Sequence, residues 1–223
     1  EEYKFSLGVI DYTAILEKAL QSNSSIPEYK IVFVDEAQDL SKLQWAFAEK
    51  VFNNAEQVYL AGDDDQAICE SFGASPKTFV EYKSDNEVVL TKSYRIPNSI
   101  NNILFSQNGI ISTLNSKYPY RKQKSWVSVD DKSEGMTAAL NLNELLDAIK
   151  EFPKKEWLVM AATHGSLSHF SEMLEYENIA HFLSNKLISQ NNEINFEPTI
   201  KLSTIWGAKG GEADCTVLLR DSF

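Results

Sequence analysis

The chain has 223 residues, of which 43% are hydrophobic and 11% aromatic, so it can bury one large core or two small ones, and this excludes intrinsic disorder. Its formal net charge of −11 excludes general electrostatic attraction as the main means of holding nucleic acid, and we expect any DNA contact to be local. In chain order, helical spacing then predicts a helix over 12–20 capped by Asp11, and a second from Ser41 to about Phe52, opened by a Ser41–Gln44 capping box.

Short apolar runs alternate with amphipathic stretches throughout, which favours α/β architecture with a largely parallel sheet. Pro97 disfavours continuous regular structure, so we expect a domain boundary near 95–98. The polar segments 108–135 and 184–198 are expected to be loops. Further helices are predicted through 142–149 and 167–174, and strands at 31–34, 58–61, 88–90, 157–161, 200–205 and 216–219.

The first of these strands delivers two adjacent carboxylates, Asp35 and Glu36, within the string Asp-Glu-Ala-Gln-Asp of residues 35–39. Phosphoryl transfer needs one acid to hold Mg²⁺ and another to orient or deprotonate water. The alternative is a helix N-terminus, which also accommodates acidic residues. The complete string after four apolar residues favours the catalytic interpretation.

The next strand ends in the turn Gly-Asp-Asp-Asp-Gln of residues 62–66. An amide at Gln66 can sense a terminal phosphate by hydrogen bonding without carrying charge. The aspartates Asp63 to Asp65 have two other interpretations. One is a divalent-cation loop, although EF-hand spacing is absent. The other is a solvated turn, the usual role of an aspartate run and the preferred interpretation in isolation.

Two later segments carry weaker signals. Tyr94 can stack on a base and Arg95 can reach phosphate oxygens, but a surface pair is the usual explanation of such neighbours. A glycine-rich turn after the 200–205 strand holds Lys209 and Glu212. Glycines let backbone N–H groups approach phosphate or sugar, although an ordinary turn also favours glycine.

Taken together, the order and spacing of these segments resemble the UvrD/Rep-type superfamily 1 DNA helicases. Residues 35–39 match the family's Walker B string, and 62–68 with Gly73-Ala74 match the following motif. Residues 94–97 match the motif at the junction of the two motor domains, and 204–212 match a later motif.

The resemblance implies RecA-like P-loop NTPase motor domains with mainly parallel sheets. Residues 1–95 would be the C-terminal part of the first domain. Residues 96–223 would be a truncated second domain with a reduced or absent inserted subdomain. ATP and Mg²⁺ would bind in a cleft between the two domains.

The resemblance also implies a role for each matched residue. Asp35 would hold Mg²⁺, Glu36 would be the catalytic base, and Gln66 would contact the γ-phosphate. Arg95 would reach the γ-phosphate as an arginine finger. The remaining nucleotide contacts would be Tyr94 on adenine, Glu212 on the ribose, and Lys209 in the same late motif.

The expected DNA contacts are Thr204, Trp206 and Phe72. Here the chain departs from the family, which has aromatic residues at the positions of Cys69 and Ser71 and a histidine at the position of Trp206. Base stacking contributes about 1–3 kcal/mol per base, so these changes weaken the expected grip on single strands. For Trp206 a place in the core is the alternative.

Two motifs of the family are absent from the sequence. No Gly-Lys-[Ser/Thr] phosphate-binding loop is present, and we expect it in a missing N-terminal part. The only arginines are Arg95, Arg121 and Arg220, so the late motif with a second arginine finger is also absent. We therefore expect the 223 residues alone to be inactive and the full-length parent to be an ATP-dependent DNA helicase.

The function predicted is ATP-driven movement on single-stranded DNA and unwinding of duplex. The expected partners are single-stranded DNA, duplex junctions and replication or repair proteins, with no membrane. One alternative is a catalytically dead helicase-like scaffold that binds DNA or protein. Another is a metal-dependent nuclease using Asp63 to Asp65. Cys69 and Cys215 form no disulfide framework, which favours a reduced intracellular setting. A compact motor of the kind that the resemblance implies would suit the cytoplasm of a bacterium or a phage-infected cell.

Overall fold

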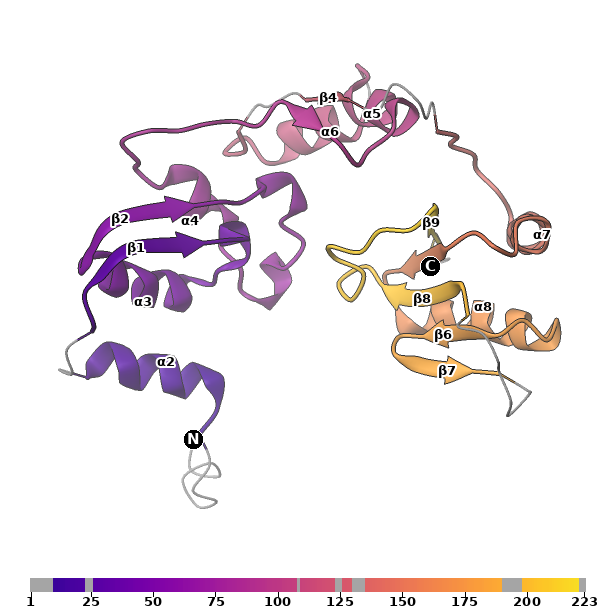
Figure 1. Ribbon diagram of the computed structural model, residues 1–223, viewed down its shortest axis with the longest axis horizontal. Helices are drawn as coiled ribbons and strands as arrows, with labels where there is room; N and C mark the ends of the chain where they lie inside the picture. Colours follow the sequence, from indigo (N-terminus) through magenta and orange to yellow (C-terminus); the bar gives the residue numbers. More distant parts are fainter. Residues whose placement is uncertain are drawn as a thin grey trace. The chain divides into compact units, whose positions relative to one another are not determined.

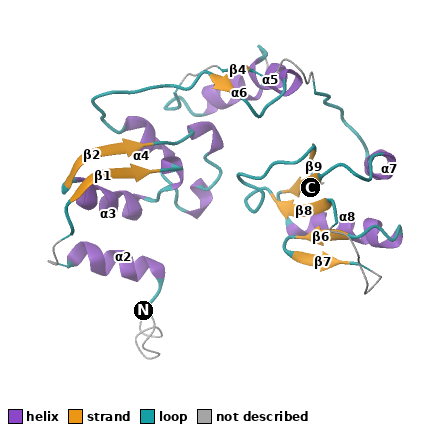
Figure 2. Ribbon diagram, viewed as in Figure 1, coloured by secondary structure: helices purple, strands orange, loops and turns teal. Residues whose placement is uncertain are grey.

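The computed structural model describes residues 10–22, 26–107, 109–122, 126–129, 135–189 and 198–220. The chain forms two compact units, residues 1–137 and residues 138–223 (Figure 1). Both contain helices and mainly parallel strands (Figure 2), which confirms the predicted α/β class. Among the described residues, no helix combines the length and the apolar character needed to cross a membrane.

The first unit is built around two parallel strands, β1 (Tyr29–Val34) and β2 (Ala55–Leu60). Helix α3 (Lys42–Phe52) connects them and begins with the predicted Ser41–Gln44 capping box. Helix α2 (Tyr12–Gln21), capped by Asp11 as predicted, packs along α3. Lys50 Nζ, on α3, donates to three carbonyls at the end of α2, those of Ala19, Leu20 and Ser22.

The core of the first unit lies between this sheet and α3. Trp45 and Phe52 are buried, and Tyr82 stacks on the Trp45 ring at a centroid distance of 5.5 Å. Tyr82 follows the short helix α4 (Pro76–Glu81). Three 3₁₀ turns connect the strand ends to these helices: η1 (Ala37–Asp39), η2 (Asp64–Gln66) and η3 (Glu70–Phe72).

The rest of the first unit differs from the prediction. The apolar run 88–90 is not a strand, because in the described part of the chain no neighbouring strand pairs with it, and Val88 and Leu90 are exposed. The strand comes later, as β3 (Lys92–Ser93), and pairs in parallel with β4 (Val127–Ser128). The expected loop 108–135 also contains a helix, α6 (Ile110–Lys117), which follows α5 (Asn98–Phe105).

The second unit has a five-stranded sheet in the order β7-β6-β8-β5-β9. The pairs β6–β8, β8–β5 and β5–β9 are parallel, and only β7 is antiparallel. The elements are α7 (Leu142–Glu151), β5 (Trp157–Ala161), α8 (His164–Tyr176), β6 (His181–Leu183), β7 (Lys186–Ile188), β8 (Ile200–Thr204) and β9 (Cys215–Leu218).

The predicted apolar faces form the core of this unit. Leu167, Phe170 and Leu174 of α8 are fully buried, and they pack with Val159 and Leu202 of the central strands. The predicted loop 184–198 contains β7, while its residues 190–197 lie outside the described part of the chain.

The compact units divide the chain at 137 and 138, whereas the sequence prediction divides it at 95 and 96. Contacts between the segment 118–122 and the turn after β2 explain why residues 96–137 belong to the first unit. The assignment of the two parts to motor domains stays a prediction.

Candidate functional site

The ends of β1 and β2 bring two polar turns together at one edge of the sheet. Parallel strands present their carboxyl ends on the same side, where ligands bind in open α/β sheets. The Ala37 N–H donates to the Ala61 carbonyl at 2.9 Å, and the Ala61 N–H donates to the Val34 carbonyl at 2.8 Å. Residues 35–39 and 61–66, far apart in sequence, therefore form one site.

Asp35 and Glu36 present exposed carboxylates at this edge. Asp35 Oδ1 accepts a hydrogen bond from the Glu36 N–H at 2.9 Å. Glu36 has φ 52° and ψ 39°, the left-handed region that a residue with a Cβ rarely adopts. Strain of this kind is of order 1–3 kcal/mol and is frequent at functional sites, although Asn178 and Ser184 share this conformation.

Gln38 lies behind these carboxylates and connects the two turns. Its side chain is fully buried. Its Nε2 donates to Glu36 Oε2 at 2.5 Å, and its Oε1 accepts from the Asp63 N–H at 3.0 Å. The site is thus held together by a side chain as well as by backbone bonds.

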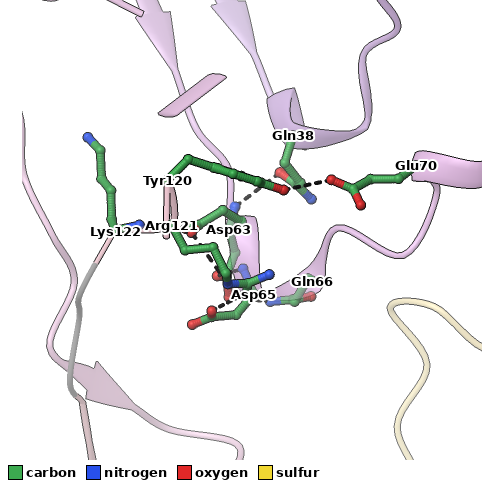
Figure 3. Close-up of polar contacts among 9 residues, drawn as sticks. Gln38, Asp63, Asp65, Gln66, Glu70, Tyr120, Arg121 and Lys122 are labelled. Carbon is green, nitrogen blue, oxygen red and sulfur yellow. Dashed lines mark hydrogen bonds and ion pairs between the residues drawn. The ribbon is translucent and has the colours of Figure 1, made fainter. Parts of the chain in front are cut away.

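Asp63 organises the second turn. Its Oδ1 accepts from the Asp65 N–H at 3.0 Å and its Oδ2 accepts from Gln66 Nε2 at 2.8 Å (Figure 3). The Gln66 amide is therefore held by its own turn, at the same sheet edge as Glu36. The structure brings the predicted residues Asp35, Glu36 and Gln66 into one site.

Asp64 and Asp65 correct the interpretation of the aspartate run as a solvated turn. Asp64 is 2% exposed, and both carboxylates pair with Arg121, whose guanidinium is also buried. Figure 3 shows the pair that Arg121 forms with Asp65. Charges are buried only when they are paired, so the run is an internal ion-pair cluster. Because Arg121 occupies these carboxylates, the geometry also gives no support to a nuclease centre at Asp63–Asp65.

Residues on both sides of Arg121 extend this contact. The Tyr120 hydroxyl donates to Glu70 Oε1 at 2.6 Å (Figure 3), and the Lys122 N–H donates to Asp64 Oδ2 at 3.2 Å. Burial, and then the hydrogen bond to the Glu70 carboxylate, raise the pKa of Tyr120 to about 12. The hydroxyl is thus a donor at neutral pH. Residues 120–122 fasten the segment after α6 to the turn 63–70.

The other predicted residues of the first unit are exposed. Tyr94 and Arg95 follow β3, and Phe72 ends η3 with 73% of its surface exposed. Exposure leaves Phe72 available for stacking, as the prediction requires. The nucleotide roles of Tyr94 and Arg95 stay predictions.

In the second unit the predicted residues share the connection from β8 to β9. Thr204 ends β8, and its Oγ1 accepts from the Gly207 N–H at 3.1 Å. Trp206 is 39% exposed, so the alternative of a buried core tryptophan is wrong. Lys209 is half-buried and Glu212 exposed, on either side of Gly210, whose φ of 77° favours glycine.

Known proteins similar to this chain include DNA helicases and a subunit of the RecBCD enzyme. The family model described as the UvrD/REP helicase N-terminal domain matches residues 6–87, which contain both polar turns. The chain is 28% identical over 153 residues to DNA helicase II of Escherichia coli (strain K12), a match covering 63% of this chain and 20% of that protein. The chain is a relative of the UvrD-type helicases.

Two further proteins show similarity to this chain. DNA helicase II of Salmonella typhimurium is 27% identical over 147 residues, which are 60% of this chain and 20% of that protein. The RecBCD enzyme subunit RecB of Chlamydia pneumoniae is 32% identical over 94 residues, 36% of this chain and 9% of that protein. The match therefore spans about a fifth of the length of the DNA helicase II proteins.

The site offers hard oxygen ligands of the kind Mg²⁺ takes. Among the described residues no group of three or more metal-binding side chains occurs. Mg²⁺ in phosphoryl-transfer sites is usually held by one or two carboxylates and completed by phosphate oxygens and water. Asp35 and Glu36 fit that donor set.

Two residues of the site had no role assigned from the sequence. Gln38 was considered only as part of the string of residues 35–39, and Arg121 only as one of the three arginines in the sequence. Gln38 gives a partial signal, because it is the one uncharged polar residue in the string of residues 35–39, between Glu36 and Asp39. Arg121 gives none, because its partners lie 56 residues or more away.

Proposed function

We propose that this chain is part of an ATP-dependent DNA helicase or translocase of the UvrD type. The observation that carries the proposal is the shared site at the ends of β1 and β2, where exposed Asp35 and Glu36 lie beside the turn that holds Gln66. Its substrates would be ATP with Mg²⁺ and single-stranded DNA. Unwinding of duplex at junctions would follow from movement along one strand.

Each side chain has a defined task in this proposal. Asp35 binds Mg²⁺, which neutralises charge on the β- and γ-phosphates. Glu36 accepts a proton from the attacking water, and its carboxylate at a strand end is accessible for that role. Gln66 donates to the terminal phosphate through its amide. Arg95 contacts the γ-phosphate and Tyr94 stacks on the adenine.

The second unit supplies the remaining contacts. Lys209 and Glu212 bind phosphate and ribose from the β8–β9 connection, and Thr204 and Trp206 bind the single strand with Phe72 of the first unit. The exposed rings of Phe72 and Trp206 support this part, because stacking needs an accessible face. Replication and repair proteins are the expected protein partners.

The test is ATP hydrolysis by the complete product of the gene, with and without single-stranded DNA. We expect DNA-stimulated turnover in the wild type and its loss, by about 10²-fold or more, in Glu36→Gln, because the base is removed. The matched control is Glu56→Gln, an exposed glutamate on β2. An unaltered rate in Glu36→Gln would remove this residue from its role. Absence of hydrolysis with retained DNA binding would favour the scaffold alternative.

A further inference from the structure

A continuous run of hydrogen bonds joins the two turns of the site. Glu36 Oε2 accepts from Gln38 Nε2, and Gln38 Oε1 accepts from the Asp63 N–H. The Asp63 carboxylate accepts in turn from Gln66 Nε2. Figure 3 shows the part from Gln38 to Gln66. The run begins at the proposed base and ends at the proposed phosphate sensor.

Only an amide of this length satisfies both neighbours of Gln38. The Asp63 N–H is a donor and needs an acceptor, whereas the Glu36 carboxylate is an acceptor and needs a donor. These partners fix which end of the amide is oxygen. A glutamate would face Glu36 with a second carboxylate, and a leucine would leave the Asp63 N–H without its acceptor.

The Gln38 amide lies in a closely packed part of the first unit. The side chain is 0% exposed. A Cβ added at Gly62 would lie 2.6 Å from Gln38 Oε1 and 2.9 Å from Phe79 Cζ. Glycine at this position therefore makes room for the amide, and any side chain at residue 62 would crowd it.

We propose that Gln38 is a positioning residue for ATP hydrolysis. It holds the Glu36 carboxylate in a fixed position relative to the turn from Asp63 to Gln66. The inference rests on the function proposed above. Gln38 itself touches no nucleotide, because it is buried behind Glu36. When Gln66 engages the terminal phosphate, any movement of its turn reaches the base through the Asp63 N–H and the Gln38 amide.

The first test uses two substitutions in the complete gene product. Gln38→Leu removes both hydrogen bonds, and Gln38→Glu keeps the acceptor for Asp63 but places a carboxylate against Glu36. We expect kcat to fall by about 10- to 100-fold in both, the range found when supporting partners of a catalytic group are lost. The KM for ATP should stay within about threefold, because ground-state binding is untouched. Gln57→Ala, an exposed glutamine on β2, is the matched control.

The second test disturbs the Gln38 amide by changing its neighbour Gly62 instead of Gln38 itself. Gly62→Ala alters no hydrogen-bonding group but crowds Gln38 Oε1, so kcat should fall in this variant as well. The melting temperature of each protein is measured alongside. If both Gln38 variants unfold, Gly62→Ala decides the question. A wild-type kcat in folded Gly62→Ala, or a kcat loss matched by an equal loss of ATP affinity, overturns the positioning role.

These outcomes separate the inference from the proposed function. Failure of the function is seen in the wild type, as absent DNA-stimulated hydrolysis, or in an active Glu36→Gln variant. The inference alone fails if the wild type hydrolyses ATP, the Glu36→Gln variant does not, and the two Gln38 variants are unaffected. In that case kcat in Gln38→Leu and Gln38→Glu stays within about twofold of the wild-type value.

Discussion

Arg121 binds the carboxylate of Asp65 across 56 residues of sequence, and both groups are withdrawn from solvent. The same guanidinium lies 3.9 Å from Asp64 Oδ2. This cluster fastens the segment after α6 to the turn that holds Gln66. Breaking the ion pairs of this cluster is therefore expected to distort the turn that holds Gln66.

Arg121→Ala should destabilise the first unit by about 3–5 kcal/mol, because two buried carboxylates lose their counter-charge. Chemical denaturation, with hydrogen exchange over residues 10–122, measures the loss. The control is Lys77→Ala, which breaks an exposed pair with Glu81 and should cost less than about 1 kcal/mol. Replacing the cluster together, as Arg121→Met with Asp64→Asn and Asp65→Asn, should recover much of the stability. Equal stability of Arg121→Ala and wild type would refute the buried cluster.

His181 gives the second unit a pH-dependent stability. It is fully buried, its Nδ1 donates to the Ile179 carbonyl at 2.9 Å, and Ser171 donates to its Nε2 at 2.7 Å, which fixes the neutral ring. Burial lowers the pKa of His181 below 6.5, against opposing effects of the Ile179 carbonyl and the Glu175 charge. The unfolded chain therefore takes up this proton more readily than the folded one.

The stability contributed by neutral His181 is complete above the unfolded pKa of about 6.5 and is lost as pH falls toward the lowered folded value. Unfolding free energy followed from pH 8 to pH 5 should decrease, with a slope of at most about 1.4 kcal/mol per pH unit from this residue. His181→Gln should flatten the profile by that amount. An identical slope in the variant would show that His181 is not buried in its neutral form.

Phe72 and Trp206 should each contribute to single-strand binding by stacking. Phe72→Ala and Trp206→Ala in the complete gene product are each expected to weaken binding of an oligonucleotide by about 1–3 kcal/mol. Fluorescence anisotropy at fixed salt measures the affinity. Tyr176→Ala, which removes an exposed ring at the end of α8, is the control and should bind as wild type does. Unchanged affinity in both variants would place the DNA elsewhere.

The 223-residue chain by itself should show negligible ATP turnover. Its sequence holds no phosphate-binding loop, so the phosphates lack the backbone cradle and the lysine that such loops supply. Phosphate release from the purified chain, with Mg²⁺ and single-stranded DNA, is the measurement. Robust hydrolysis would show that another part of the chain replaces the loop.

Local signals in the sequence were sufficient for most helices and for the strands that form the cores. Asp11 and the Ser41–Gln44 pair cap helices because capping depends on residues three apart. The buried faces of α7 and α8 follow from apolar spacing alone. The shared edge of Asp35, Glu36 and Gln66 follows from the rule that parallel strands present their carboxyl ends on the same side.

Contacts between residues far apart in the sequence could not be predicted from these local signals. The run 88–90 has the composition of a strand, but a strand needs a neighbour, and the pairing occurs at Lys92 instead. The polar stretch after residue 108 was expected to be a loop, yet it contains α6 and, in Arg121, the partner of two aspartates. The buried state of Asp64 follows only from that distant arginine.

The central claim is that Asp35, Glu36 and Gln66 surround the terminal phosphate of one nucleotide. A crystal structure of the complete gene product with Mg²⁺, ADP and aluminium fluoride tests it most directly. The account predicts the Asp35 carboxylate bound to Mg²⁺ directly or through water, with Glu36 and the Gln66 amide within about 3 Å of the attacking water or the fluoride. A nucleotide bound away from the ends of β1 and β2 would contradict it.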